Sequence, residues 1–147
     1  MADNNRPLPE EPKGELVIRT LAMPADTNPS GDIFGGWLLS QMDLGGAIAA
    51  KEIVENRVIT IAITAVRFWN PVHVGDTVCV HADLLKIGKT SLTLHINAWA
   101  VAMYHKEKRR LVTEADFTYV SIDDNGKPAL IKTESKDRSA QPPHQIK

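Results

Sequence analysis

The sequence predicts an α+β fold, in which a curved antiparallel sheet of about five strands is wrapped around one long central helix. Three observations carry this prediction. The chain has 147 residues, of which 43% are hydrophobic, and this is enough for one packed domain. A single long stretch, residues 37–55, has the apolar spacing of a helix. The segments before and after it show the two-residue alternation that is typical of strands.

The first strand is expected at Glu15–Met23, and Pro24 ends it. Residues 1–14 contain three prolines and scattered charges, so they are expected to form a flexible leader. They hold no apolar stretch of the kind found in a secretory signal, and a cytoplasmic protein is expected. Residues 131–147 hold no aromatic residue and are expected to form a flexible tail. The folded domain is therefore predicted to span residues 15–130.

The predicted helix follows a loop at residues 25–36 that is dense in Asp, Asn, Ser, Pro and Gly. The helix is apolar on nearly all sides, which indicates that other elements surround it. The apolar run at residues 33–50 also contains Asp43 and four glycines. It therefore indicates a buried helix rather than a membrane span, and no membrane association is expected.

Four strands are expected after the helix. They follow Asn56 up to Phe68 and then occupy Thr77–Ile87, Ser91–Val101 and Leu111–Ile122. In the first of them the alternating apolar positions shift by one residue, which predicts a bulge near Ala65. The four strands can pair in succession as antiparallel hairpins.

Strands 77–87 and 91–101 both carry their apolar residues at even positions. Directly opposed residues point to the same side of a sheet, so the residue numbers of each pair in this hairpin must sum to an even value. This pairing requires either a loop with an odd number of residues or a bulge near Gly88. His81 and His95 face each other if the pairs sum to 176, but a third ligand is missing, so no metal site is expected. The face that carries these histidines and Trp99 is mixed polar and aromatic, which is typical of a subunit contact.

Composition excludes several classes of function. The only cysteine, Cys79, rules out a disulfide within the chain and a metal site with several cysteine ligands. The formal net charge is −1, which argues against electrostatic binding to nucleic acid. The chain has no G-x-S-x-G motif, so a serine hydrolase of that type is not expected.

Five of the nine glycines lie between Gly31 and Gly46, and the pair Gly35-Gly36 stands at the start of the predicted helix. Backbone N–H groups point outward there, and the helix dipole is positive. Such a turn can bind a carbonyl oxygen that becomes negative in a transition state. The alternative is a glycine turn that serves only the sharp entry into a buried helix, and the spacing leaves both interpretations open.

Asp43 is the only charged residue between Asp32 and Lys51. Most of its helical neighbours are small, which leaves room for a ligand or another backbone. A carboxylate in such surroundings is costly unless it is hydrogen-bonded or used in chemistry, and both interpretations stay open. Asn28 lies in the preceding loop, where it can hold a water or a carbonyl group, or act only as a turn residue before Pro29.

The turn at residues 88–91 carries a cation and two hydroxyl groups on a flexible backbone, from Lys89, Thr90 and Ser91. A phosphate or a pantetheine chain can be bound by such a set of donors.

The stretch from Leu21 to Asp43, LAMPADTNPSGDIFGGWLLSQMD, resembles the YciA-type acyl-CoA thioesterases of the hotdog superfamily. The segments PVHVGD, GKTS and EADFTYVSIDDNGKP resemble them too, so that the resemblance extends from about Glu15 to Leu130. It implies the hotdog fold, in which the sheet wraps a central helix. It also implies hydrolysis of acyl-CoA thioesters to a free acid and CoA, without a metal or another cofactor.

The resemblance also implies site residues. The family's catalytic carboxylate falls on Asp43, as general base or nucleophile, its loop asparagine on Asn28, and its carbonyl-polarising turn on the backbone at Gly35 and Gly36. The CoA contacts fall on Lys89, Thr90 and Ser91.

The family further implies a homodimer whose sheets join edge to edge, assembled as a homohexamer that is a trimer of dimers, with active sites between protomers. A hotdog protein that binds CoA or acyl-CoA without turnover is the alternative. A hotdog dehydratase is disfavoured, because the catalytic histidine that it needs near the glycines is missing.

Overall fold

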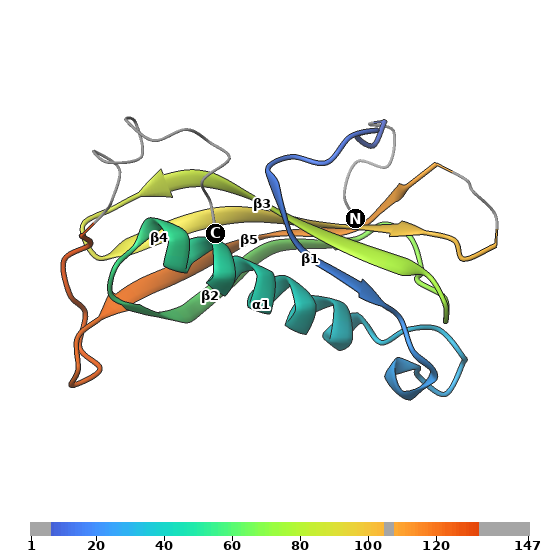
Figure 1. The fold of residues 1–147 in the computed structure, drawn as a ribbon, viewed down its shortest axis with the longest axis horizontal. Coiled ribbons are helices and arrows are strands. Elements are labelled where there is room, and N and C mark those ends of the chain that lie inside the picture. Colours follow the sequence, from blue (N-terminus) through green and yellow to red (C-terminus); the bar gives the residue numbers. More distant parts are fainter. Residues whose placement is uncertain (1–6, 105–107, 133–147) are drawn as a thin grey trace.

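The computed structural model describes residues 7–104 and 108–132 (Figure 1). Residues 1–6, 105–107 and 133–147, which include part of the predicted leader at 1–14 and most of the predicted tail at 131–147, lie outside the described residues. In chain order the elements are β1 (Glu15–Leu21), the 3-10 helix η1 (Pro24–Asp26), α1 (Gly35–Ile53), β2 (Arg57–Phe68), β3 (Thr77–Ile87), β4 (Ser91–Val101) and β5 (Arg110–Ile122). The five strands form one antiparallel sheet in the order β1-β3-β4-β5-β2. The predicted architecture of one long helix on a five-stranded sheet is confirmed.

The core lies between α1 and one face of the sheet, as Figure 1 shows. The even-numbered apolar residues of β3 and β4 point to the helix, and Val80, Leu94 and Ile96 are almost completely buried there. Leu38 and Met42 meet them from the helix. Each such side chain contributes roughly 1.5–3 kcal/mol of transfer free energy, and this burial holds the helix on the sheet.

Both expected irregularities of the strands are present. The pairing of β2 with β5 shifts between Thr64 and Arg67, and Ala65 has a positive φ of 54°, which confirms the bulge. The pairing of β3 with β4 shifts between Leu84 and Lys86, which confirms that this hairpin needs an extra residue before its turn.

Two expectations about strand pairing are wrong. The strand β2 does not pair with β3: it lies beside β5 at one edge, while β3 pairs with β1 at the other. The segment between them crosses the end of the core, where Val72 is buried and its carbonyl accepts a hydrogen bond from Ile33 N at 3.0 Å. His81 and His95 do not face each other, because His81 pairs with Asn97 and His95 with Asp83.

The helix is less enclosed than its composition predicts. In the single chain Leu44 is 56% exposed and Ile48 is 43% exposed, because the sheet covers only one side of α1. The edge strand β2 is also open, and Ile61 is 56% exposed there. Among the described residues, no helix is long and apolar enough to cross a membrane.

Candidate active site

The Asp43 carboxylate lies on the middle of α1 and is held by two hydroxyl groups from the sheet. Thr60 on β2 donates a hydrogen bond to Asp43 Oδ1 at 2.6 Å, and the Tyr119 hydroxyl on β5 lies 3.2 Å from the same oxygen. Thr60 and Tyr119 are directly paired across the two strands, so that both hydroxyls reach one point on the helix. Within residues 7–104 and 108–132, Oδ2 has no hydrogen-bond donor and no cation lies within salt-bridge distance of Asp43.

These two hydroxyl partners were not predicted. Thr60 and Tyr119 lie far from Asp43 along the chain, and nothing in the local pattern marks them. The one available signal was a tyrosine at a position of the last strand that faces inward, where a buried hydroxyl needs a partner. Burial, and after it the charge of Asp43 and the hydrogen bond to it, raises the pKa of Tyr119 above its usual range. The Tyr119 hydroxyl therefore stays protonated and acts as a donor.

The two glycines begin α1, as expected. Phe34 stands at the N-cap, and its carbonyl accepts hydrogen bonds from Trp37 N and Leu38 N at 3.1 and 3.3 Å. In the described part of the chain, the N–H groups of Gly35 and Gly36 have no acceptor, so both are available to a ligand.

The surroundings of the two glycines differ. A Cβ on Gly35 would stand 3.0 Å from the Phe68 ring. A Cβ on Gly36 would have no atom of the described residues within 4 Å, apart from its chain neighbours and the backbone of its own helix. A cavity of about 380 Å³ opens beside Gly35, and its apolar lining includes Leu38, Phe68 and Val72. The space above Gly36 is therefore open to a substrate or to a second chain.

Asn28 shapes the loop before the helix. Its Oδ1 accepts hydrogen bonds from Ser30 N at 2.9 Å and from Asp32 N at 3.1 Å, which is the geometry of a turn residue. Among the described residues its Nδ2 has no acceptor, so the amide can still donate to a ligand. The structural role of Asn28 is thus present, and its catalytic role stays a prediction.

The turn at residues 88–91 lies at the end of the molecule opposite to the glycine turn. Lys89 O accepts a hydrogen bond from Ile131 N, and Lys132 O accepts one from Glu55 N, which ties this turn to the C-terminal end of α1. Figure 1 shows the turn between β3 and β4 beside that end of the helix, with the start of α1 at the opposite end. The donors of Lys89, Thr90 and Ser91 are therefore about a helix length from the glycines of the same chain.

A single chain does not bring the candidate groups together. Gly36 and Asp43 are two turns apart on one helix, which is about 10 Å at 1.5 Å per residue. A group that takes a proton must lie within about 3 Å of the atom that loses it, or be linked to it by one water. Along one helix the glycine turn and Asp43 are therefore well beyond hydrogen-bond distance of each other.

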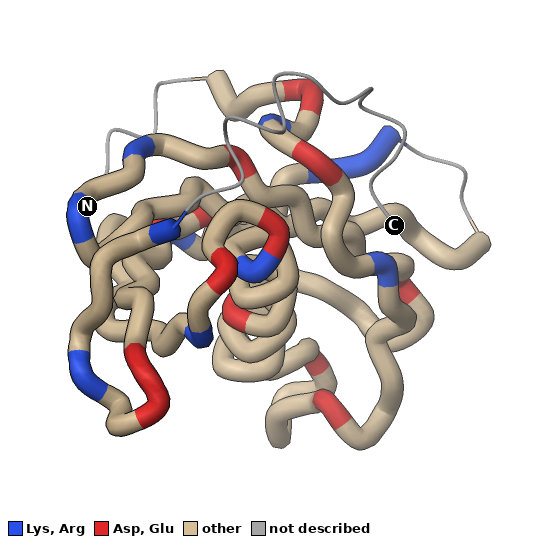
Figure 2. The backbone as a smooth tube through the Cα atoms, turned by 60° about the vertical axis from the view of Figure 1, so that its left-hand side comes forward, with Lys and Arg blue, Asp and Glu red and all other residues tan. Residues whose placement is uncertain are grey.

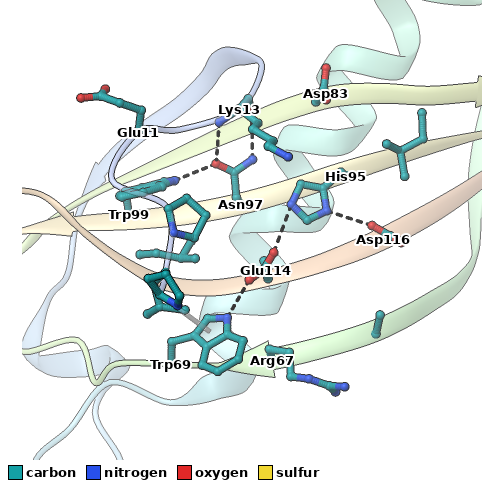
Figure 3. A pocket seen from close by; sticks show the side chains of 16 residues that line it. Glu11, Lys13, Arg67, Trp69, Asp83, His95, Asn97, Trp99, Glu114 and Asp116 are labelled. Atoms are coloured by element: carbon teal, nitrogen blue, oxygen red, sulfur yellow. Dashed lines mark hydrogen bonds and ion pairs between the residues drawn. The ribbon is translucent and has the colours of Figure 1, made fainter. Parts of the chain in front are cut away.

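A second cavity, of about 560 Å³, lies on the outer face of the sheet, away from the helix (Figure 3). It lies between residues 7–13 and the strands, where Asn97 and Lys13 form two hydrogen bonds of 3.2 and 2.9 Å. His95 lies between Asp116 at 2.9 Å and Glu114 at 3.4 Å. None of the predicted site residues lines this cavity, and its suggested use as a subunit contact stays a prediction.

Among the described residues, no group of three His, Cys, Asp or Glu side chains has the geometry to hold a metal ion. What the site offers is a carboxylate with one unengaged oxygen and, on the same helix, two unpaired N–H groups. These are the parts needed to activate a water and to polarise a carbonyl group.

The chain belongs to the thioesterase superfamily. The model of that family matches residues 30–104, which include the glycine turn, α1 and the strands β2 to β4.

The acyl-CoA thioester hydrolase YciA of Salmonella typhimurium is 56% identical over 119 residues, 80% of this chain and 90% of that protein. A hexameric thioesterase from Yersinia pestis shares 54% identity with a TM-score of 0.78, over 84% of this chain and 99% of its own. A hexameric broad-specificity acyl-coenzyme A thioesterase shares 45% identity with a TM-score of 0.81, over 88% of this chain and 89% of its own. The neighbours confirm the hotdog fold.

Proposed function

We propose that the protein hydrolyses acyl-CoA thioesters to a free carboxylic acid and CoA. The observation that carries this proposal is the Asp43 carboxylate, of which Oδ1 is held by two hydroxyls while Oδ2 is free among the described residues. The relatives named acyl-CoA thioester hydrolase support the substrate class.

In the proposed reaction the thioester carbonyl oxygen accepts hydrogen bonds from the N–H groups of Gly35 or Gly36. As a general base, Asp43 takes a proton from a water that attacks the carbonyl carbon. The tetrahedral intermediate then expels the CoA thiolate by cleavage of the C–S bond, and the thiolate takes up the proton. As a nucleophile, Asp43 would instead attack the carbonyl carbon and displace the CoA thiolate by cleavage of the C–S bond. Water would then hydrolyse the resulting anhydride to the free acid and the Asp43 carboxylate. Asn28 is proposed to orient the water or the thioester through its free Nδ2.

The proposed active site is shared between two chains. The separation of about 10 Å along one helix between Gly36 and Asp43 supports a site in which the two groups come from different protomers. The open edge of β2 and the exposed face of α1 support a dimer in which two sheets join edge to edge. We further propose that three such dimers form a homohexamer, which the hexameric relatives support.

The CoA phosphates are proposed to meet local cations rather than a general positive field. Lys and Arg are interleaved with Asp and Glu along the described chain, as Figure 2 shows. Lys89 is exposed, and within the described residues no carboxylate forms a salt bridge with it. We assign CoA contacts to Lys89, Thr90 and Ser91, and the catalytic unit to residues 15–130 in a cytoplasmic protein.

The test is release of free thiol from a panel of acyl-CoAs, by the wild type and by Asp43→Asn. The expected result is turnover by the wild type and a fall in kcat of about 10²–10⁴-fold in the variant, as is typical when a general base is lost. Thiol release by Asp43→Asn at the wild-type rate would exclude Asp43 as the catalyst. Tight CoA binding without thiol release by the wild type would favour the alternative, a non-catalytic binding protein.

A further inference from the structure

We propose that Tyr119 is a positioning residue for catalysis: its hydroxyl holds the Asp43 carboxylate in the orientation that presents Oδ2 to the substrate. This inference rests on the proposed function of Asp43. It assigns a role in the reaction to a residue that lies in the core, on the strand β5, rather than on a loop or in a cavity.

The geometry that supports it is a double contact between the strand and the helix. The Tyr119 hydroxyl lies 3.1 Å from the backbone oxygen of Asp43 and 3.2 Å from its Oδ1. Tyr119 is only 1% exposed, so that its ring is fixed by packing and its hydroxyl cannot exchange these partners for bulk water. A side chain held at both its backbone and its carboxylate has few other rotamers available.

The helix is shaped to receive this hydroxyl. A Cβ on Gly46 would stand 2.0 Å from the Tyr119 hydroxyl, so only glycine at that position lets the oxygen approach the helix backbone. A glycine in the middle of a helix carries a cost in stability relative to alanine. Gly46 and Tyr119 therefore form a matched pair, and the approach of this hydroxyl accounts for that cost.

The protonation state of Tyr119 keeps its hydrogen bond to Asp43 in place over a wide range of pH. Because burial and the nearby Asp43 raise the pKa of Tyr119 above its ordinary value of about 10, its hydroxyl keeps its proton at neutral pH. Thr60 binds the same Oδ1 from β2, an exposed edge strand, whereas Tyr119 binds it from the interior of the sheet. The two donors leave Oδ2 as the oxygen that faces the reaction.

The test is Tyr119→Phe, which removes only the hydroxyl. We expect kcat to fall about 10- to 100-fold, because a reacting group that is displaced by about 1 Å loses activity on this scale. We expect KM to change little, since Tyr119 does not touch the substrate. Tyr104→Phe is the matched control, because Tyr104 is 85% exposed and is the only other tyrosine; its kcat should equal that of the wild type.

A second measurement separates positioning from a purely structural role. In the Asp43→Asn background, Tyr119→Phe should cause no further loss of single-turnover rate with enzyme in excess, because the group that it positions is already inactive. An equal loss in both backgrounds, or a Tyr119→Phe enzyme with wild-type kcat, would overturn the proposal. The two failures are distinguishable: no thiol release by the wild type would overturn the proposed function itself, whereas an active wild type with an equally active Tyr119→Phe variant would overturn only the role of Tyr119.

Discussion

Asp43 lies among hydroxyl groups rather than cations, and its surroundings set what its carboxylate can do. An arginine partner can engage both oxygens in a bidentate ion pair, whereas Thr60 and Tyr119 engage only Oδ1. The sequence singled out Asp43 because a carboxylate on an apolar helix is costly unless it is hydrogen-bonded or used in chemistry. It could not supply the two partners, since they come from strands that are remote in the chain and meet the helix only in the fold.

The buried hydroxyl of Tyr119 also predicts how stability depends on pH. Its pKa is raised in the folded protein, so above its ordinary value of about 10 the unfolded chain loses this proton first. The free energy of unfolding should therefore fall above pH 10, by up to about 1.4 kcal/mol per pH unit from this group. Denaturant titrations at pH 9 and 11 should show a smaller fall for Tyr119→Phe than for the wild type. The same fall in both proteins would contradict the burial of an un-ionised Tyr119.

Substitution of the two glycines at the start of α1 by alanine should have different effects on packing. Gly36→Ala should keep or raise the melting temperature, since its Cβ meets nothing within 4 Å and alanine favours a helix by up to about 1 kcal/mol. It should nevertheless lower kcat/KM, because the methyl group occupies the proposed thioester position. Gly35→Ala should displace the Phe68 ring, which its Cβ would approach to 3.0 Å. Wild-type kcat/KM for Gly36→Ala would show that the space above Gly36 is not used.

At the scale of elements, the alternation of apolar and polar residues predicted each strand, and the irregularities in that alternation predicted the bulges. The shift in apolar positions placed one bulge at Ala65, and the matching even positions of β3 and β4 required another. The partner of β2 was not predictable in this way, because alternation defines which face of a strand is buried but not which strand lies beside it. The open faces of β2 and α1 were also unforeseen, since composition does not distinguish a side buried within one chain from a side buried between two.

The edge of β2 carries a prediction of its own. Ile61→Lys places a charge on a side chain that is 56% exposed in the single chain, and it should split the oligomer and abolish thiol release. Val74→Lys is the control, since Val74 is 44% exposed but lies in the turn before β3. Light scattering reports the molar mass of each variant. An Ile61→Lys protein with the mass and activity of the wild type would show that β2 is not the interface.

At the scale of the whole molecule, the size of the chain limits what it can do alone. The 147 residues build a complete core, but the glycine turn, Asp43 and the turn at 88–91 are spread along the length of α1. In the proposed dimer, a two-fold pairing would bring different parts of two copies together, so that each dimer would contain two equivalent composite sites. The near-zero net charge agrees with this account, because binding of CoA then depends on local donors rather than on the field of the whole protein.

The most direct test of the account is complementation between two inactive chains. Asp43→Asn lacks the carboxylate, and Gly36→Val blocks the glycine turn with a branched side chain. In a mixed dimer, one of the two sites has both an intact turn and an intact Asp43. Chains that are co-expressed in equal amounts and pair at random should therefore recover about a quarter of the wild-type thioesterase activity. Activity no higher than that of the two variants measured separately would contradict a site that is shared between chains.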